Sequence, residues 1–266
     1  MQTDKMKLFS LLTVLFLLIS ISSQAQTKFG LSAGYVSSYQ TISNPNVASV
    51  RAFDSWAVES KSTQLSGIAF TIDLDHQLNT KWNFRAGIGY VQKGQIEEIV
   101  NQEPGGKRYT AAAYKDELNY INIPARFNYS LFRKNDFSIS VGAGMYLGFG
   151  VDGKTSQKIF EHTYSLFYTP PQEYQGRVHF KSSMSSRDDY PDEDIVVKPL
   201  DLGLVTGFAM TIKNFEFFFD YQLGLNDVHA KIDTVRPNSN DEYSNARIKC
   251  NRSLITGVRF WLFNLK

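Results

Sequence analysis

Apolar and polar side chains alternate along eight stretches of the chain. In one of them, Trp82, Phe84 and Ile88 share a face, while Arg85 and Gly87 share the opposite face. A period of two predicts β-strands with one apolar face, because successive side chains of a strand point to opposite sides. The predicted strands cover residues 29–35, 68–75, 82–93, 121–131, 137–149, 200–212, 215–226 and 254–262.

Short and long connections alternate between these strands. Short polar turns lie at residues 79–81, 133–136 and 213–214. The long connections are residues 39–65, 97–116, 152–198 and 227–250. Outer-membrane barrels have short periplasmic turns and long extracellular loops, whereas a soluble barrel or sandwich has no reason to place every long loop at one end. We therefore predict an all-β fold, an eight-stranded antiparallel up-and-down transmembrane β-barrel with four long extracellular loops.

The two faces of the predicted strands differ in chemistry. One is bulky and free of charge, and it must meet lipid, because a charge there costs about 2–4 kcal/mol at the bilayer midplane. The charged residues expected to point into the narrow lumen are Asp73, Asp75, Arg85, Arg126, Asp201, Glu216, Asp220 and Arg259. Buried charges need partners, so this set favours an ion-pair network over a proton or solute relay.

Pro124 falls inside the fourth predicted strand. Proline removes a hydrogen bond from the ladder and is normally confined to edge strands or bulges. Because alternation continues on both sides of Pro124, we keep the strand and predict a local bulge there.

The N-terminal region has the pattern of a secretory signal peptide. Lys5 and Lys7 precede a mostly apolar run from Leu8 to Ile21, and small and polar residues follow at 22–26. A membrane anchor is the alternative, but the run is shorter than the ~20 apolar residues of a spanning helix. We expect a cleaved signal peptide over residues 1–26 and one outer-membrane β-barrel domain over residues 27–266.

The composition agrees with an exported barrel. Cys250 is the single cysteine, so the chain cannot form an intrachain disulfide and must be stabilised in another way. Without residues 1–26 the chain has 26 basic and 25 acidic residues, a balance that gives no indication of nucleic-acid binding. Aromatic residues make up 14 % of the sequence, which is typical of membrane barrels.

Three short motifs follow one another along the chain: Tyr120-Ile121-Asn122-Ile123-Pro124, Asp201-Leu202-Gly203 with Gly207, and the segment from Phe219 to Asp227. They resemble motifs of the PorT-like outer-membrane β-barrel family, which is common in Bacteroidetes. The Gln24-Ala25-Gln26 exit is also similar. The resemblance covers the chain from about residue 27 to its end and implies an outer-membrane barrel.

Most members of this family have no assigned role, and the founding member is linked to type IX secretion and gliding. No residue of this chain defines that role. The end of the chain departs from the usual pattern, because Phe263 is followed by Asn264, Leu265 and Lys266 instead of ending the strand.

The long connection at residues 152–198 holds the groups that would suit chemistry. They are His162, His179, Asp188, Asp189, Asp192, Glu193 and Asp194. No Ser, His and Asp form a nucleophile motif, no histidine pair has metal-ligand spacing, and the acidic run lacks the spacing of a calcium loop. We therefore predict a protein that is not an enzyme, with no catalytic, metal or cofactor-binding residues and no cofactor.

Two functions remain open. The first is a structural or interaction role in the cell envelope, with the lipid bilayer and other envelope proteins as partners and no nucleic acid. Loop aromatics suited to such contacts are Tyr109, Tyr114, Tyr164, Phe167, Tyr168, Tyr174 and Tyr190. The alternative is a narrow small-solute transporter or channel of the outer membrane.

Overall fold

The computed structural model describes residues 26–42, 57–102, 108–163, 171–184, 195–228, 231–232 and 249–265. Within these ranges the regular elements are strands, and no helix is long and apolar enough to cross a membrane. The strands are β1 (Thr27–Ile42), β2 (Ala57–Gln77), β3 (Trp82–Gln102), β4 (Arg108–Lys134), β5 (Phe137–Thr163), β6 (Gln172–Phe180), β7 (Ser183–Met184), β8 (Ile195–Val197), β9 (Leu200–Ile212), β10 (Phe215–Gly224), β11 (Lys231–Ile232) and β12 (Lys249–Leu265).

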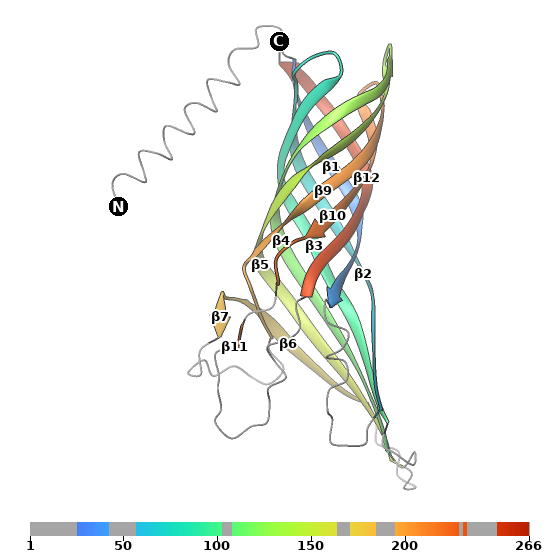
Figure 1. The fold of residues 1–266 in the computed structure, drawn as a ribbon, viewed down its shortest axis with the longest axis vertical. Helices are drawn as coiled ribbons and strands as arrows, with labels where there is room; N and C mark the ends of the chain where they lie inside the picture. Colours follow the sequence, from blue (N-terminus) through green and yellow to red (C-terminus); the bar gives the residue numbers. More distant parts are fainter. Residues whose placement is uncertain are drawn as a thin grey trace, which may run out of the picture.

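Eight of these strands close into a ring. Their order is β4-β3-β2-β1-β12-β10-β9-β5, and pairing between β4 and β5 closes it. All eight neighbouring pairs are antiparallel, and Figure 1 shows the ring as a tilted barrel. Each predicted strand lies in a different ring strand, so the predicted eight-stranded antiparallel barrel is confirmed.

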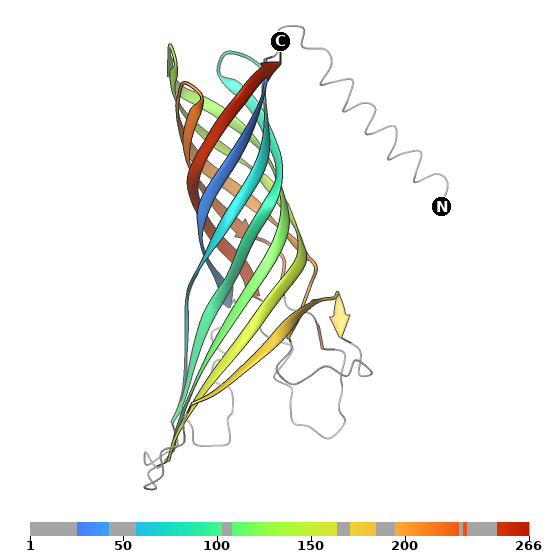
Figure 2. The same ribbon diagram turned by 180° about the vertical axis from the view of Figure 1, so that it is seen from behind.

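The strands at one side of the ring run far beyond the barrel. β3 continues to Gln102 and β4 begins at Arg108, so the predicted connection at residues 97–116 is mostly a hairpin. We call this extension the projecting sheet. It comprises residues 57–64 of β2, 95–102 of β3, 108–117 of β4, 154–163 of β5 and 172–177 of β6. Figure 2 shows these strands leaving the barrel together at the extracellular end.

The predicted bulge at Pro124 is wrong. Pro124 lies opposite Tyr146 in an unbroken register with β5. On its other side β4 pairs with β3, and the two pairs between Ala86↔Ala125 and Gly89↔Asn122 are missing. The register is the same before and after this gap. The proline therefore weakens the ladder locally, because it lacks an N–H, but no residue is inserted. The register shifts of β4 against β5 lie elsewhere, between Asn119 and Tyr120 and between Ser130 and Phe132.

The predicted face assignment is confirmed by burial. Outward apolar side chains such as Ile72 and Phe127 are 58 % and 53 % exposed, whereas inward Asp201 and Glu216 are 0 % and 2 % exposed. Aromatic pairs surround the barrel near the short turns, including Phe215 and Phe260 with ring centroids 5.0 Å apart. An apolar band flanked by aromatic residues is the outer surface of a barrel that spans a bilayer.

Candidate functional site

The half of the lumen near the short turns holds an ion-pair network. Arg85 binds Glu216 through both terminal nitrogens, at 2.6 and 2.9 Å, and its Nε lies 3.1 Å from Asp75. Arg259 bridges the same Glu216 to Asp73, whose carboxylate lies 2.7 Å from its Nε. These groups come from β2, β3, β10 and β12, so the network joins opposite walls of the barrel.

A second ion pair, Arg126 with Asp220, lies beside the network. Seven of the eight predicted inward charges thus meet in this half of the lumen, and the predicted ion-pair network is confirmed. The two parallel hydrogen bonds from Arg85 to Glu216 make this pair stronger and fix its geometry better than a single contact would. Arg126 and Asp220 both line the small cavity described below.

An apolar layer borders the network. Its members are Val36, Ala69, Val91, Ala209, Phe218 and Ile255, all 6 % exposed or less. The sequence analysis did not identify this layer, although each member occupies an inward position of its strand. Phe218, for example, lies between the inward residues Glu216 and Asp220 on its strand. An apolar residue at such an inward position could have indicated the layer.

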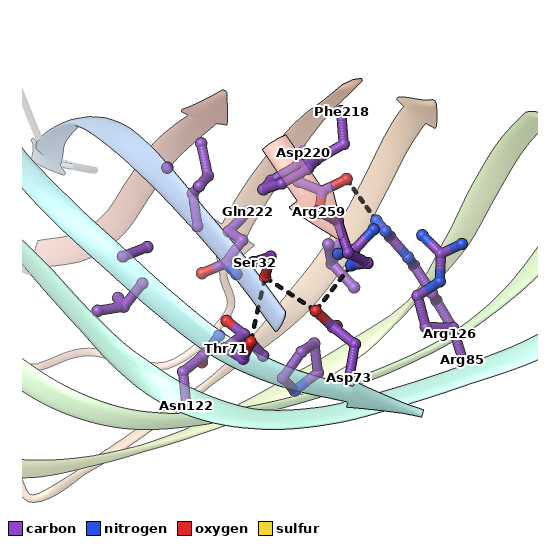
Figure 3. Close-up of a pocket in the computed structure, with 16 residues that line it drawn as sticks. Ser32, Thr71, Asp73, Arg85, Asn122, Arg126, Phe218, Asp220, Gln222 and Arg259 are labelled. Carbon is purple, nitrogen blue, oxygen red and sulfur yellow. Dashed lines mark hydrogen bonds and ion pairs between the residues drawn. The ribbon is translucent and has the colours of Figure 1, made fainter. Parts of the chain in front are cut away.

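A cavity of about 30 Å³ separates the network from this layer (Figure 3). Ser32 donates to Asp73 at 2.8 Å on its wall. Asn122 Oδ1 and Gln222 Oε1 are buried without a partner among the described residues, and both side chains line the cavity. Its size suits about two water molecules, which need polar partners of this kind. It is far too small for a solute path.

Farther along the lumen lies a buried lysine. Lys93 Nζ is 2.9 Å from Asp201, and both side chains are 0 % exposed. Tyr146 and Asn251 donate to the same carboxylate at 3.2 and 3.1 Å, and Lys93 lies 4.1 Å from the centre of the Tyr146 ring. The inward position of Asp201 was predicted. Lys93 falls on the polar face of its predicted strand, but its pairing with Asp201 was not predicted.

At the extracellular mouth, residues 178–180 of β6 pair with β8, and we call these two segments the plug. Val178 and Val197 of the plug pack with Leu118 and Tyr120 of β4. The backbone holds the plug in place, since Gly150 N donates to Pro199 O and Lys198 N donates to Val228 O, both at 2.7 Å. Part of the predicted loop at residues 152–198 is therefore folded onto the barrel. Among the described residues, the plug, the Lys93 cluster, the apolar layer and the ion-pair network thus follow one another along the lumen.

The projecting sheet has a different chemistry. Its ion pairs, Lys115 with Glu117 and Lys158 with Glu173, are largely exposed. On the opposite face Thr155 donates to Asp116 at 2.9 Å, and Gln157 donates to Tyr114 at 3.1 Å. A shallow polar hollow of about 280 Å³ lies over β4, β5 and β6. Polar side chains on exposed strands suit contacts with hydrated molecules.

The loop residues considered for chemistry are only partly described. His179 and Tyr174 lie on β6, while the acidic run at residues 188–194 and the aromatics Tyr164, Phe167, Tyr168 and Tyr190 lie outside the described residues. The side chains of Tyr109 and His162 are also outside them. In the described part of the chain, no group of three or more His, Cys, Asp or Glu side chains is placed to hold a metal.

The chain is similar to solved outer-membrane proteins. Ail, the attachment invasion locus protein of Yersinia pestis, is 11 % identical, with 90 % of this chain and 99 % of that chain covered and a TM-score of 0.33. OprG from Pseudomonas aeruginosa is 7 % identical, with 89 % and 94 % covered and a TM-score of 0.28. No curated protein sequence matches the chain.

A protein-family model gives the decisive match. The model of the outer membrane protein beta-barrel domain aligns with residues 20–230, which is most of the chain. The closed ring of eight strands and its apolar outer band agree with that description. The chain therefore belongs to the outer membrane protein beta-barrel domain family and is an outer-membrane β-barrel protein.

Proposed function

We propose that this barrel has a structural or interaction role in the envelope, with the projecting sheet as its contact surface. The observation that carries the proposal is the filled lumen beside a long sheet that leaves the membrane. The ion-pair network, the apolar layer and the plug follow one another along the lumen, and the cavity between two of them holds about 30 Å³. The channel alternative requires a path that these layers occupy.

We further propose that residues 1–26 are a cleaved signal peptide and residues 27–266 the mature domain. The basic start, the apolar run and the small-residue exit support this division. N-terminal sequencing of protein extracted from outer membranes tests it. A mature chain that still begins at Met1 or Met6 would contradict it.

Membership of the PorT-like subgroup is a finer proposal, and the positions of its motifs support it. Tyr120 of the first motif and Asp201 of the second meet in the buried cluster around Lys93, where Tyr120 and Asp201 both contact Asn251. Asn226 of the third motif receives the Leu202 N–H at 2.6 Å and donates to Leu200 O at 2.6 Å. The first two motifs thus share a buried cluster, and the third fixes the start of β9, so the motif residues have structural roles.

Photo-crosslinking in intact cells tests the contact surface. A photoreactive residue at Ser156, on the projecting sheet, should give protein adducts, whereas the same residue at Met145, in the lipid-facing band, should give lipid adducts only. Replacing residues 98–113 with an Asn-Gly turn should abolish the Ser156 adducts and leave the barrel assembled, because Glu97 and Tyr114 are paired neighbours.

A planar-bilayer recording tests the alternative. We expect no steady porin-sized current from the full-length protein, because side chains fill an eight-stranded barrel. A large, steady current together with no protein adduct at Ser156 would favour the channel.

A further inference from the structure

The periplasmic end of the barrel holds an open hollow that the proposed envelope role does not use. Its volume is about 580 Å³, and we call it the periplasmic vestibule. The start of β1 and the turns β4–β5 and β9–β10 surround it. Asp75 and Asn83 also line it, and Asp75 belongs to the ion-pair network. The vestibule therefore opens to the periplasm and ends blindly at the network.

Three cations line this vestibule: Lys28, Arg133 and Lys213. Within the described residues none of them forms an ion pair, and Arg133 only donates a long hydrogen bond of 3.4 Å to Ser130. The acids offset them only in part. Asp75 is already bound by Arg85 at 3.1 Å and by Asn83 at 2.5 Å, which leaves Asp136 as the other carboxylate of the lining.

The cations are spread around the mouth. Lys28 lies on β1 and Arg133 on β4, and these strands are three positions apart in the ring. Lys213 lies in the turn before β10, which is two positions from β1. From β9, which ends just before Lys213, β4 is again two positions away. Neighbouring strands are about 4.8 Å apart, so the cations are separated by roughly 10–15 Å along the wall. One small anion cannot contact all three, whereas a chain that carries several carboxylates can.

Other basic side chains lie on the outer, lipid-facing side of the wall. Lys81 Nζ lies 6.0 Å from the centre of the Tyr129 ring, on the lipid-facing side. Lys134 follows Arg133 directly, and the alternation of the strand places it on the outer side of the wall. The vestibule cations face the aqueous mouth instead.

We propose that the periplasmic vestibule binds an acidic peptide segment of a periplasmic protein. Several carboxylates of one segment would pair with the three separated cations, and complementary charge speeds and orients such an encounter. Because the ion-pair network closes the vestibule, the segment docks there and does not pass through. The site lies at the opposite end of the barrel from the projecting sheet, so each proposal can fail without the other.

Two double variants with equal loss of charge test this proposal. Lys28→Gln with Arg133→Gln removes two vestibule cations, and Lys81→Gln with Lys134→Gln removes two outer cations. The full-length protein is extracted in zwitterionic detergent, and a dye-labelled peptide of alternating Glu and Gly is titrated by fluorescence anisotropy at low salt. The vestibule pair should weaken binding about tenfold, while the outer pair should change it less than about twofold.

Three results would overturn the proposal. Equal weakening by both pairs would mean that the peptide senses general surface charge. Displacement of the peptide by inorganic phosphate at an equal concentration of charge would indicate a single-anion site. Displacement by phosphatidylglycerol at about one lipid per protein would indicate a lipid site. Heat-modifiable gel migration confirms that both double variants are folded, as expected for changes at strand ends and in a turn, outside the ion-pair network.

Discussion

The barrel wall and the projecting sheet share the strands β2, β3, β4 and β5, yet their outward faces differ. Along β4 the wall presents Ile123 and Phe127, which are 37 % and 53 % exposed, whereas the sheet presents Lys115 and Glu117. The change follows the surrounding medium, because lipid excludes charges that water accepts. Apolar alternation therefore predicts where a strand lies in the bilayer and does not predict where the strand ends.

The ion pairs of the two regions differ in the same way. The side chains of Arg85 and Glu216 are 5 % and 2 % exposed, while those of Lys115 and Glu117 are 45 % and 29 % exposed. Breaking a buried pair leaves an uncompensated charge and costs about 3–5 kcal/mol, whereas an exposed pair contributes about 0–1 kcal/mol. The wall depends on its charges for stability, and the sheet is free to use its charges for contacts.

The largest effect is expected from Glu216→Ala. It removes the shared partner of Arg85 and Arg259, so both guanidinium groups lose an ion pair inside the lumen. We expect the free energy of unfolding to fall by about 3–5 kcal/mol, with loss of assembled protein. Heat-modifiable migration on a cold detergent gel and urea unfolding in micelles measure this. Glu117→Ala is the matched control in the projecting sheet, where we expect a change within about 1 kcal/mol; similar losses in both would contradict the comparison.

A lipid-facing charge is the next test. Ala143→Arg places a cation on the outward face of β5 within the apolar band and should cost about 2–4 kcal/mol of insertion free energy. Ser156→Arg on the same strand, in the projecting sheet, should be tolerated. Inward Ser140→Arg should impair insertion less than Ala143→Arg, although the crowded lumen adds a steric cost. The assembled fraction of each variant is read on the same gels, and equal tolerance at residues 143 and 156 would refute the position of the bilayer.

A smaller effect is expected from Tyr146→Phe. Asp201 loses one charge-assisted hydrogen bond but keeps Lys93 and Asn251, so we expect a loss of about 1.5–3 kcal/mol in unfolding free energy. Tyr114→Phe in the projecting sheet removes a hydroxyl that accepts from Gln157 and should cost about 0.5–1.5 kcal/mol. Urea unfolding in micelles measures both. A larger loss at Tyr114 would show that the sheet is the more tightly coupled region.

The sequence predicted the features that depend on period and polarity. The eight ring strands and the inward position of eight charges followed from alternation alone. The pairing of these charges did not, because Arg85 and Glu216 are 131 positions apart and meet only through the order in which the ring closes.

Other features were missed because polarity misled the prediction. The hairpin of β3 and β4 mixes apolar residues such as Ile96 and Val100 with polar ones and has no strict alternation, so its residues were assigned to a loop. The plug was missed for the opposite reason, since its apolar residues Val178 and Phe180 stand in a long polar connection with no regular alternation. Pro124 was assigned a bulge because sequence rules do not distinguish a missing bridge from an inserted residue.

The smallest effect concerns the plug and sharpens the deletion suggested by the long connection. Gly150 N contacts Pro199 O at 2.7 Å, so β5 and β9 already meet on the barrel side of the plug. A four-residue Gly-Ser linker in place of residues 153–198 can therefore remove the plug, together with the β5 and β6 parts of the projecting sheet, and keep the ring paired from Phe149↔Leu200 onward.

This variant should assemble and should still show no steady porin-sized current. The apolar layer around Val36 and Phe218 and the network around Glu216 lie deeper in the lumen and keep their partners. Planar-bilayer recording measures the current, and heat-modifiable migration confirms assembly. A large current would show that the plug alone separates the lumen from water. Failure to assemble would show that the removed segment stabilises the barrel, through the plug's contacts with Leu118 and Tyr120 or through the sheet pairing of β5 with β4. The wall would then depend for its stability on residues outside the ring. The contrast between a barrel that is stable on its own and a surface that is free for contacts would no longer hold for this part of the chain.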